Sequence, residues 1–281
     1  MPITVWGLAI AQALLTTGNI LLVAVSALIG KQLASHPALI TLPVALQFLG
    51  LIMATLPAAH LMHKMGRKVG FIVGNCIGLL GTWVALQGLE ANSLMHFASG
   101  TFLIGMAIGT GQQYRFAALD VCAIEQRPRA ISMVMAGGIL AAILGPNLAI
   151  WSRQWFDGNP FVGAFYGLFI IYVLALILIS SLPLAAPIKH TVKQVTRSYA
   201  ELFKQPLLVA AIASGAIGYA IMVLLMTATP IAMQQDEFPF SNIAWVIQWH
   251  VLGMYAPSFF TGGLIRRYSS RTVVLWGCAT L

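Results

Sequence analysis

Eight long apolar stretches, separated by shorter polar segments, dominate this sequence of 281 residues. A helix needs about 20 predominantly apolar residues to cross the hydrocarbon layer of a membrane, and each stretch reaches that length. The stretches are continuous rather than alternating, which favours helices over the strands of a membrane barrel. We therefore predict an all-α membrane protein with spans at residues 6–30, 38–62, 69–89, 93–118, 130–151, 160–182, 206–233 and 242–265.

The composition favours a lipid environment. Hydrophobic residues make up 59% of the chain and charged residues 8%, with a mean hydropathy of +0.87. A soluble domain carries about 25% charged residues, so a soluble fold is the much weaker alternative. Histidine and cysteine are not spaced as metal ligands, and the sequence has neither a phosphate-binding glycine loop nor a nucleophile-elbow serine. It predicts no metal, no cofactor and no catalytic residue, and therefore no enzymatic activity.

The positive charges alternate between successive connections. Of the 15 Lys and Arg residues, only Lys31 and Arg153 lie in odd-numbered connections, and the other 13 (15 less 2) lie in even-numbered ones. Cytoplasmic connections are enriched in Lys and Arg, so the pattern predicts a cytoplasmic N-terminus. This topology explains the net charge of +8 better than nucleic-acid binding does, because the sequence has no basic helix of that kind.

A long polar connection at residues 183–205 follows the sixth span and divides the chain. We expect a six-helix N-terminal bundle at 1–182, a central cytoplasmic loop at 183–205, and an incomplete C-terminal bundle at 206–281. Within the loop, residues 192–203 could form an amphipathic helix on the membrane surface. The motif at 63–69 recurs at an offset of 204 residues, which indicates that the second bundle repeats the first.

The connection after the second span carries a distinctive polar motif. It matches the pattern Gly-x-Leu-x-Asp-Arg-x-Gly-Arg-Lys at Leu61, Gly66, Arg67 and Lys68 and departs from it at His63, which stands in place of the Asp. Three further matches are the segment 127–132, the pair Gly145-Pro146, and the segment 262–271. With these motifs the chain resembles the major facilitator superfamily along its whole length.

That resemblance implies a secondary transporter that moves a small solute by alternating access in the inner (plasma) membrane of a bacterium. It also implies a cytoplasmic gate formed by His63, Lys64, Gly66, Arg67 and Lys68. In the fifth span, the spacing of small residues predicts close helix packing, and the proline that follows predicts a bend. The packing residues are Gly137, Gly145 and Pro146.

Polar side chains inside the spans are candidates for a substrate cavity, because polar groups in lipid face a cavity or another helix. Gln12, Thr16 and Asn19 share one face of the first span, where they either line a cavity or form hydrogen bonds between helices. Arg115 either anchors the inner end of the fourth span or binds an anion. The full candidate set is Gln12, Thr16, Asn19, Gln47, Gln112, Arg115, Asn147, Tyr219, Trp249 and His250.

His250 is the only ionisable residue near the middle of the eighth span. Imidazole changes charge near neutral pH, so His250 could carry a coupling proton, and the alternative is a histidine bonded to a neighbouring helix. Trp245 and Trp249 form an aromatic wall beside it or face lipid. The expected partners are a small-molecule solute, the lipid bilayer and a coupling proton or ion, with no nucleic acid.

Two other functions stay open at this point. The last ten residues are uncharged and amount to half of a span, so we expect the sequence to stop within a ninth span. A non-transporting truncated fragment is therefore one alternative. A membrane-embedded sensor or assembly partner is the other.

Overall fold

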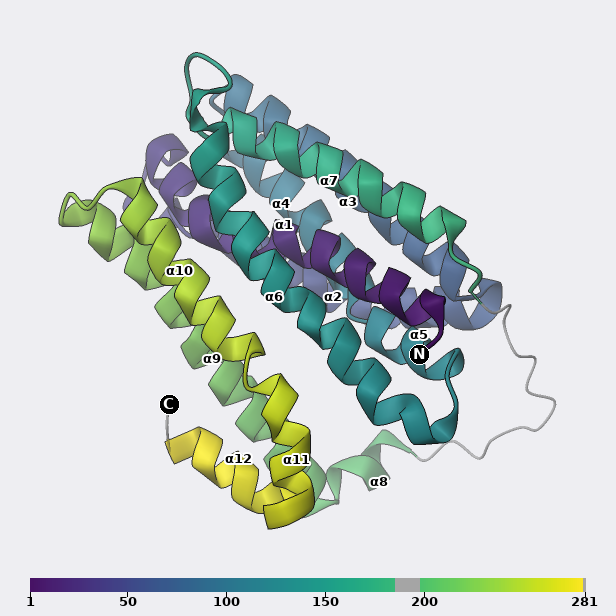
Figure 1. Cartoon of the computed structure of the whole chain (residues 1–281). Helices are drawn as coiled ribbons and strands as arrows, with labels where there is room; N and C mark the ends of the chain where they lie inside the picture. The colour runs from purple at the N-terminus through teal and green to yellow at the C-terminus, as the bar shows by residue number, and fades with distance from the viewer. Residues whose placement is uncertain (185–197, 280–281) are drawn as a thin grey trace.

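The helices expected from the sequence are present and pack side by side (Figure 1). The computed structural model describes residues 1–184 and 198–279. Within these residues, seven helical segments are long and apolar enough to cross a membrane, which confirms an all-α, multi-pass membrane fold. The segments are Ile3–Leu33, Pro37–Met65, Arg67–Glu90, Leu94–Asp120, Ile124–Gln154, Val162–Ser181 and Pro206–Gln235.

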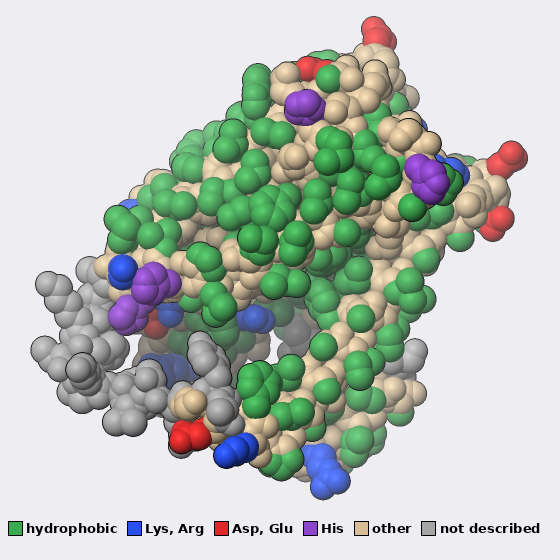
Figure 2. All heavy atoms as spheres, turned by 180° about the vertical axis from the view of Figure 1, so that it is seen from behind, with side chains coloured by type: hydrophobic (Ala, Val, Ile, Leu, Met, Phe, Trp, Pro, Cys, Tyr) green, Lys and Arg blue, Asp and Glu red, His purple; other side chains and the backbone are tan. Residues whose placement is uncertain are grey.

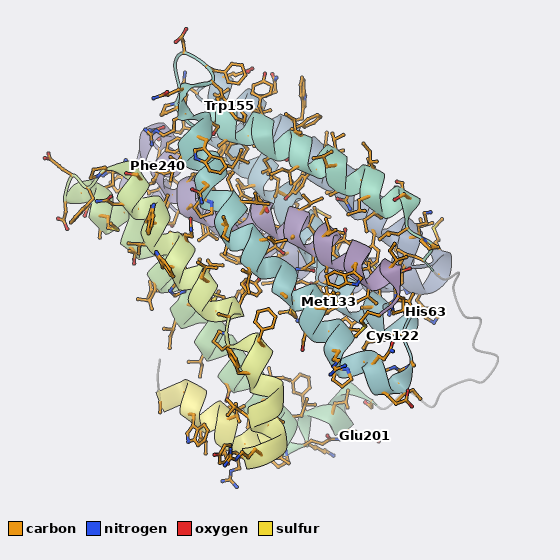
Figure 3. The ribbon with its side chains drawn as sticks, in the orientation of Figure 1. His63, Cys122, Met133, Trp155, Glu201 and Phe240 are labelled. Carbon is orange, nitrogen blue, oxygen red and sulfur yellow. The ribbon has the colours of Figure 1, made fainter. Side chains whose placement is uncertain are left out.

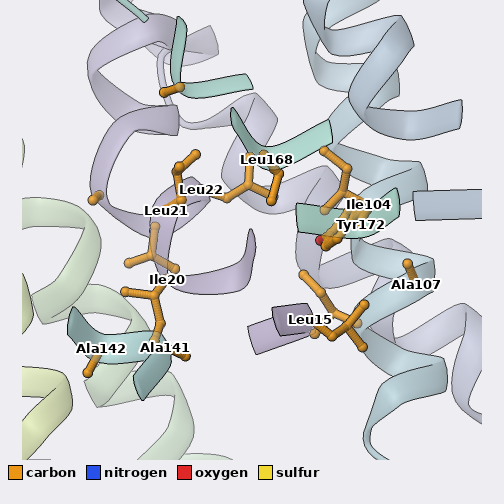
Figure 4. Packing of buried hydrophobic residues seen from close by; sticks show 14 of the residues in the cluster. Leu15, Ile20, Leu21, Leu22, Ile104, Ala107, Ala141, Ala142, Leu168 and Tyr172 are labelled. Atoms are coloured by element: carbon orange, nitrogen blue, oxygen red, sulfur yellow. The ribbon is translucent and has the colours of Figure 1, made fainter. Parts of the chain in front are cut away.

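Helix α1 (Ile3–Leu33) is the most deeply buried of these segments, since 89% of the residues in its most apolar 18-residue stretch are buried. It contacts helices on several sides, which suits a helix that is apolar all round. Leu15 and Ile20 of α1 are among the residues that pack at the centre, together with Ala141 and Tyr172 (Figure 4). The other long helices of the first bundle are α2 (Leu42–Met65), α3 (Arg67–Glu90), α4 (Leu94–Gly111), α6 (Arg127–Trp151) and α7 (Val162–Ser181).

Glycine lets two pairs of helices approach backbone to backbone. A Cβ atom at Gly105 on α4 would lie 1.9 Å from the carbonyl oxygen of Gln47 on α2, and one at Gly50 on α2 would lie 2.1 Å from a carbonyl oxygen of α4. On α6, a Cβ atom at Gly137 would lie 2.4 Å from the carbonyl oxygen of Ala9 on α1. Such contacts increase dispersion attraction between helices where the hydrophobic effect between them is absent.

The proposed bend of the fifth span falls within one continuous helix. Helix α6 runs through Pro146 without ending there. A Cβ atom at Gly145 would lie 3.1 Å from the carbonyl oxygen of Thr17, so this glycine also faces α1. Gly137 and Gly145 thus lie on the side of α6 that packs against the central helix.

Two of the predicted spans are not single helices. The fourth is divided into α4 and α5 (Tyr114–Asp120) at Gln112 and Gln113, because glycines at 109 and 111 weaken the helix before the break. The eighth is divided into α10 (Phe240–Tyr255) and α11 (Ser258–Tyr268). Pro257 explains this second break, since its ring clashes with the preceding turn of a helix and disfavours helical geometry at the residue before it.

The second part of the described chain consists of α8 (Tyr199–Phe203), α9 (Pro206–Gln235), α10, α11 and α12 (Ser270–Ala279). Residues 185–197, which include most of the predicted central loop and much of the predicted amphipathic helix at 192–203, lie outside the described residues. Three short 3₁₀ helices complete the described secondary structure: Pro37–Leu39, Ile124–Gln126 and Ser152–Gln154.

The outer surface is that of a membrane protein. In Figure 2, hydrophobic side chains cover the flank of the first bundle, while charged side chains gather toward the two ends. Large apolar side chains such as Ile52, Leu56 and Leu80 are more than half exposed. An apolar belt of this kind is stable in lipid and would aggregate in water.

Candidate functional site

A cavity of about 160 Å³ lies where the first bundle meets the second part of the chain. Helix α1 forms one wall, and α9 and α10 form the facing walls. The side chain of Phe48 on α2 and that of Gln112, between α4 and α5, complete it. The lining residues are Asn19, Ile20, Val23, Phe48, Gln112, Tyr219, Met222, Val223, Met226, Thr227, Val251, Met254 and Tyr255.

Two amide side chains, Asn19 and Gln112, line this cavity together with the hydroxyl side chains of Tyr219, Thr227 and Tyr255. The Asn19 side chain is oriented by Gln47 of α2, whose Nε2 donates a 2.8 Å hydrogen bond to Asn19 Oδ1. Gln47 is fully buried, and its own Oε1 has no hydrogen-bond partner among the described residues. Asn19 therefore keeps its Nδ2 group as a donor, and Gln112 adds a second amide that can donate or accept.

Aromatic and thioether side chains form the rest of the wall. The rings of Phe48 and Tyr219 meet edge to face, with centroids 5.9 Å apart and planes at 90°. Three methionines, Met222, Met226 and Met254, line the same space. Methionine is flexible and polarizable and makes favourable contacts with aromatic rings, so this wall suits a flat aromatic solute.

A groove of about 790 Å³ lies next to the cavity, between α2 and α9. Phe48, Tyr219, Val223 and Thr227 line both spaces. Sites for drug-sized molecules usually measure about 300–1,000 Å³. The inner cavity, at about 160 Å³, is smaller than this and holds only a part of such a solute in the conformation described.

The structure divides the sequence candidates into groups. Asn19, Gln112 and Tyr219 line the cavity, and Gln47 supports Asn19. The remaining candidates, Gln12, Thr16, Arg115, Asn147, Trp249 and His250, are not part of its lining.

Those six have other environments. Gln12 Nε2 donates a 2.8 Å hydrogen bond to Thr16 Oγ1, so these two buried side chains satisfy one another. Asn147 Nδ2 donates to Gln248 Oε1 at 2.8 Å and thereby joins α6 to α10. The Gln12–Thr16 bond thus lies within the first span, whereas the Asn147–Gln248 bond joins two helices.

The other three differ more from one another. Trp249 is 61% exposed and, with Trp245, lines a separate groove on the outside of α10. The Arg115 guanidinium lies 5.2 Å from the ring of its neighbour Phe116. The Nε2 atom of His250 is buried and has no hydrogen-bond partner among the described residues.

The polar motif after the second span is held by an ion pair. Gly66, which ends α2, has a φ of 93°, a conformation that favours glycine and explains its place in the motif. Arg67 Nε then pairs with Asp120 Oδ2 at the end of α5. Their side chains are 28% and 39% exposed, so this pair contributes little to stability and mainly fixes the motif beside α5.

Sequence reasoning did not identify the apolar part of the cavity. Phe48, Met222, Met226 and Tyr255 lie in uniformly apolar stretches, where nothing in the sequence separates a residue that faces a cavity from one that faces lipid. Periodicity gives no help, because a helix inside a membrane can be apolar on both sides. The polar candidates carried the only usable signal.

Comparison with known proteins adds an independent finding. The family model described as Major Facilitator Superfamily matches residues 8–281. A riboflavin transporter, RfnT of Brucella anthropi, is 39% identical over 272 residues, which cover 96% of this chain and 68% of that protein. Two uncharacterized MFS-type transporters of Bacillus subtilis, YddS and YdeG, are each 26% identical, and this chain covers 63% and 64% of their lengths. The chain thus spans about two thirds of the length of these relatives.

Proposed function

We propose that this chain, which belongs to the Major Facilitator Superfamily and is a secondary transporter of a small solute, carries an uncharged, flat aromatic heterocycle. Riboflavin is the first solute to test, because a relative that is 39% identical is named as its transporter. The observation that carries the proposal is the cavity between α1, α9 and α10, whose aromatic, thioether and amide walls suit such a ring system.

The chemistry of the wall supports this class of solute. The Phe48 and Tyr219 rings and the methionines offer apolar contacts to a planar ring. Asn19 and Gln112 offer amide groups to the carbonyl and N–H groups at the edge of a flavin-like ring. The described lining includes no charged side chain, which favours a neutral solute over an ionised one.

The proposal includes a location and an orientation. The protein is a multi-pass membrane protein. We place it in the plasma membrane of a bacterium with its N-terminus in the cytoplasm, on the basis of the Lys and Arg residues in every second connection. In this orientation the motif at 63–68 faces the cytoplasm and gates access there, while Arg153 lies on the opposite side.

Labelling of a cysteine in the cavity tests the proposal. The variant Asn19→Cys, in a protein whose Cys76, Cys122 and Cys278 are replaced by Ser, should react with a membrane-permeant thiol reagent. Riboflavin at ten times its dissociation constant should slow this reaction about tenfold, because it occupies most of the sites. Thr16→Cys is the control, since Thr16 is 6% exposed and is not part of the lining. Equal labelling of Asn19→Cys with and without riboflavin would count against the flavin proposal.

Coupling to protons is a separate part of the proposal, and His250 is its candidate residue. The His250 Nε2 atom is buried, and no hydrogen bond to a described residue occupies it. His250→Gln should abolish the dependence of riboflavin uptake on external pH between about 5 and 8, because glutamine does not titrate in that range. If the variant keeps the pH dependence of the wild type, His250 does not couple protons.

A further inference from the structure

The first bundle and the second part of the chain meet along α6, which contacts both α10 and α11. On α9 the described buried residues are Met226 and Pro230, both in its second half. Residues of its first half are open to the outside, with Leu207 86% and Ile217 61% exposed. In Figure 1, α9 and α10 run beside α6 near the α9–α10 turn, whereas α8 and α12 lie farther from the first bundle.

A charged side chain bridges the two parts at the closed end. Arg153 lies in the short helix that follows α6. Its guanidinium carbon is 4.6 Å from the ring centroid of Phe240 and 5.3 Å from that of Phe161. The centroids of the two rings are 5.6 Å apart, and the ring planes are inclined at 72°. Phe161 belongs to the first bundle, whereas Phe240 is the first residue of α10, so the cation lies between rings from both parts.

The first-bundle side of this contact is rigid. Ser152 is 1% exposed, and a Cβ atom at Gly163 would lie 2.2 Å from its carbonyl oxygen, so the short helix at 152–154 is pressed against the start of α7. Phe161 is 2% exposed, and its backbone N–H donates a 3.0 Å hydrogen bond to Asn159 Oδ1. Arg153 therefore extends from a closely packed part of the first bundle toward α10, which must move if the two parts of the chain are to separate at this end.

The contact between Arg153 and Phe240 lies at the end of the molecule that carries the α9–α10 turn. Figure 3 shows Phe240 beside the end of the first bundle that carries Trp155, far from His63 and Cys122 at the other end. Among the described residues Arg153 forms no ion pair. Its contact with aromatic rings is therefore its main described interaction, and a cation within about 6 Å of a ring is attracted to the ring face.

We infer that Arg153 is a positioning residue of the transport cycle, which keeps the end of the cavity near the α9–α10 turn closed by binding Phe240 across the two parts of the chain. The inference uses membership of the transporter family but does not depend on the identity of the solute. Loss of the cation should shift the balance toward the conformation that is open at this end by about 3- to 30-fold.

The test measures how often this end opens. Met226, which lines the cavity and is 6% exposed, is replaced by Cys in a protein without its three native cysteines. A bulky, membrane-impermeant maleimide is added to sealed right-side-out and inside-out vesicles. The variant Asp157→Cys, whose cysteine lies close to Arg153 in the sequence, is labelled only in vesicles that expose the Arg153 side to the reagent. It therefore identifies the vesicle orientation to use. Size-exclusion chromatography confirms that each variant is folded.

Arg153→Gln should label at Met226→Cys about 3- to 30-fold faster than the parent protein from that side. Phe240→Leu, which keeps an apolar side chain and removes the ring, should act in the same way and serves if Arg153→Gln does not fold. Arg153→Lys should restore slow labelling in part, because it keeps the positive charge. Arg267→Gln is the matched control, since the ring that Arg267 contacts among the described residues is that of its own neighbour Tyr268. Unchanged labelling in Arg153→Gln and Phe240→Leu, or no rescue by lysine, would overturn the inference.

Discussion

Replacing Gly105 with leucine is expected to prevent the first bundle from folding. The Cβ atom alone would lie 1.9 Å from the carbonyl oxygen of Gln47, a backbone atom that cannot turn aside as a side chain does. Helices α2 and α4 would have to separate, and Gly50, on the same interface, would lose its contact with α4. Forcing extra groups into a packed interior usually costs about 1–3 kcal/mol, and a leucine at a backbone crossing exceeds that range.

The expected result is an absence of monodisperse protein in detergent for Gly105→Leu, and a lowered melting temperature for Gly105→Ala. Size-exclusion chromatography and thermal unfolding measure both. Gly218→Ala is the control, because a Cβ atom at Gly218 on α9 would meet nothing within 4 Å. It should leave the melting temperature unchanged or raise it slightly, since alanine favours a helix more than glycine does. A Gly105→Leu protein that melts like the wild type would disprove the packing described for α2 and α4.

Removing the Tyr219 ring is expected to raise the KM for riboflavin uptake about 5- to 150-fold. Stacking of a flat heterocycle on an aromatic side chain contributes about 1–3 kcal/mol, and 1.4 kcal/mol corresponds to a factor of ten. Tyr219 lines both the inner cavity and the adjoining groove, so its ring is available to a solute in either space. Uptake kinetics of Tyr219→Ala in liposomes measure the effect.

Two variants distinguish the ring from other causes. Tyr219→Phe keeps the ring and its edge contact with Phe48, so its KM should stay within about threefold of the wild type. Trp249→Ala removes an aromatic side chain of similar exposure that lines a different groove, and it should leave the KM unchanged. If Trp249→Ala raised the KM as much as Tyr219→Ala, the effect would not be specific to the cavity, which would contradict the proposed site.

The positions of the membrane helices were predictable from the sequence, because hydrophobic length is set by the thickness of the bilayer. Predicted and observed ends differ by a few residues in most spans; the third, for example, was predicted at 69–89 and is found at Arg67–Glu90. The breaks at Gln112 and Pro257 were not predicted, because hydropathy does not register a local loss of helix geometry. A proline within an apolar stretch gave the one sequence signal for the second break.

The cavity was predictable only in part. A polar residue inside a span must satisfy its hydrogen bonds, but the sequence does not say with which group. Asn19 does so at the cavity, whereas Gln12 and Thr16, on the same face of the first span, bond to each other. Asn147 bonds to Gln248, 101 residues away in the sequence, a pairing that only the packing of α6 against α10 creates. Long-range contacts of this kind decide which polar residues remain available to a solute.

Transport of labelled riboflavin by the purified chain in liposomes tests the central claim most directly. We expect saturable uptake above that of protein-free liposomes, competition by an excess of unlabelled riboflavin, and a KM that rises in Tyr219→Ala and not in Trp249→Ala. Folded, monodisperse protein that takes up no more riboflavin than protein-free liposomes would contradict the proposed solute, and equal kinetics for the two aromatic variants would contradict the proposed site.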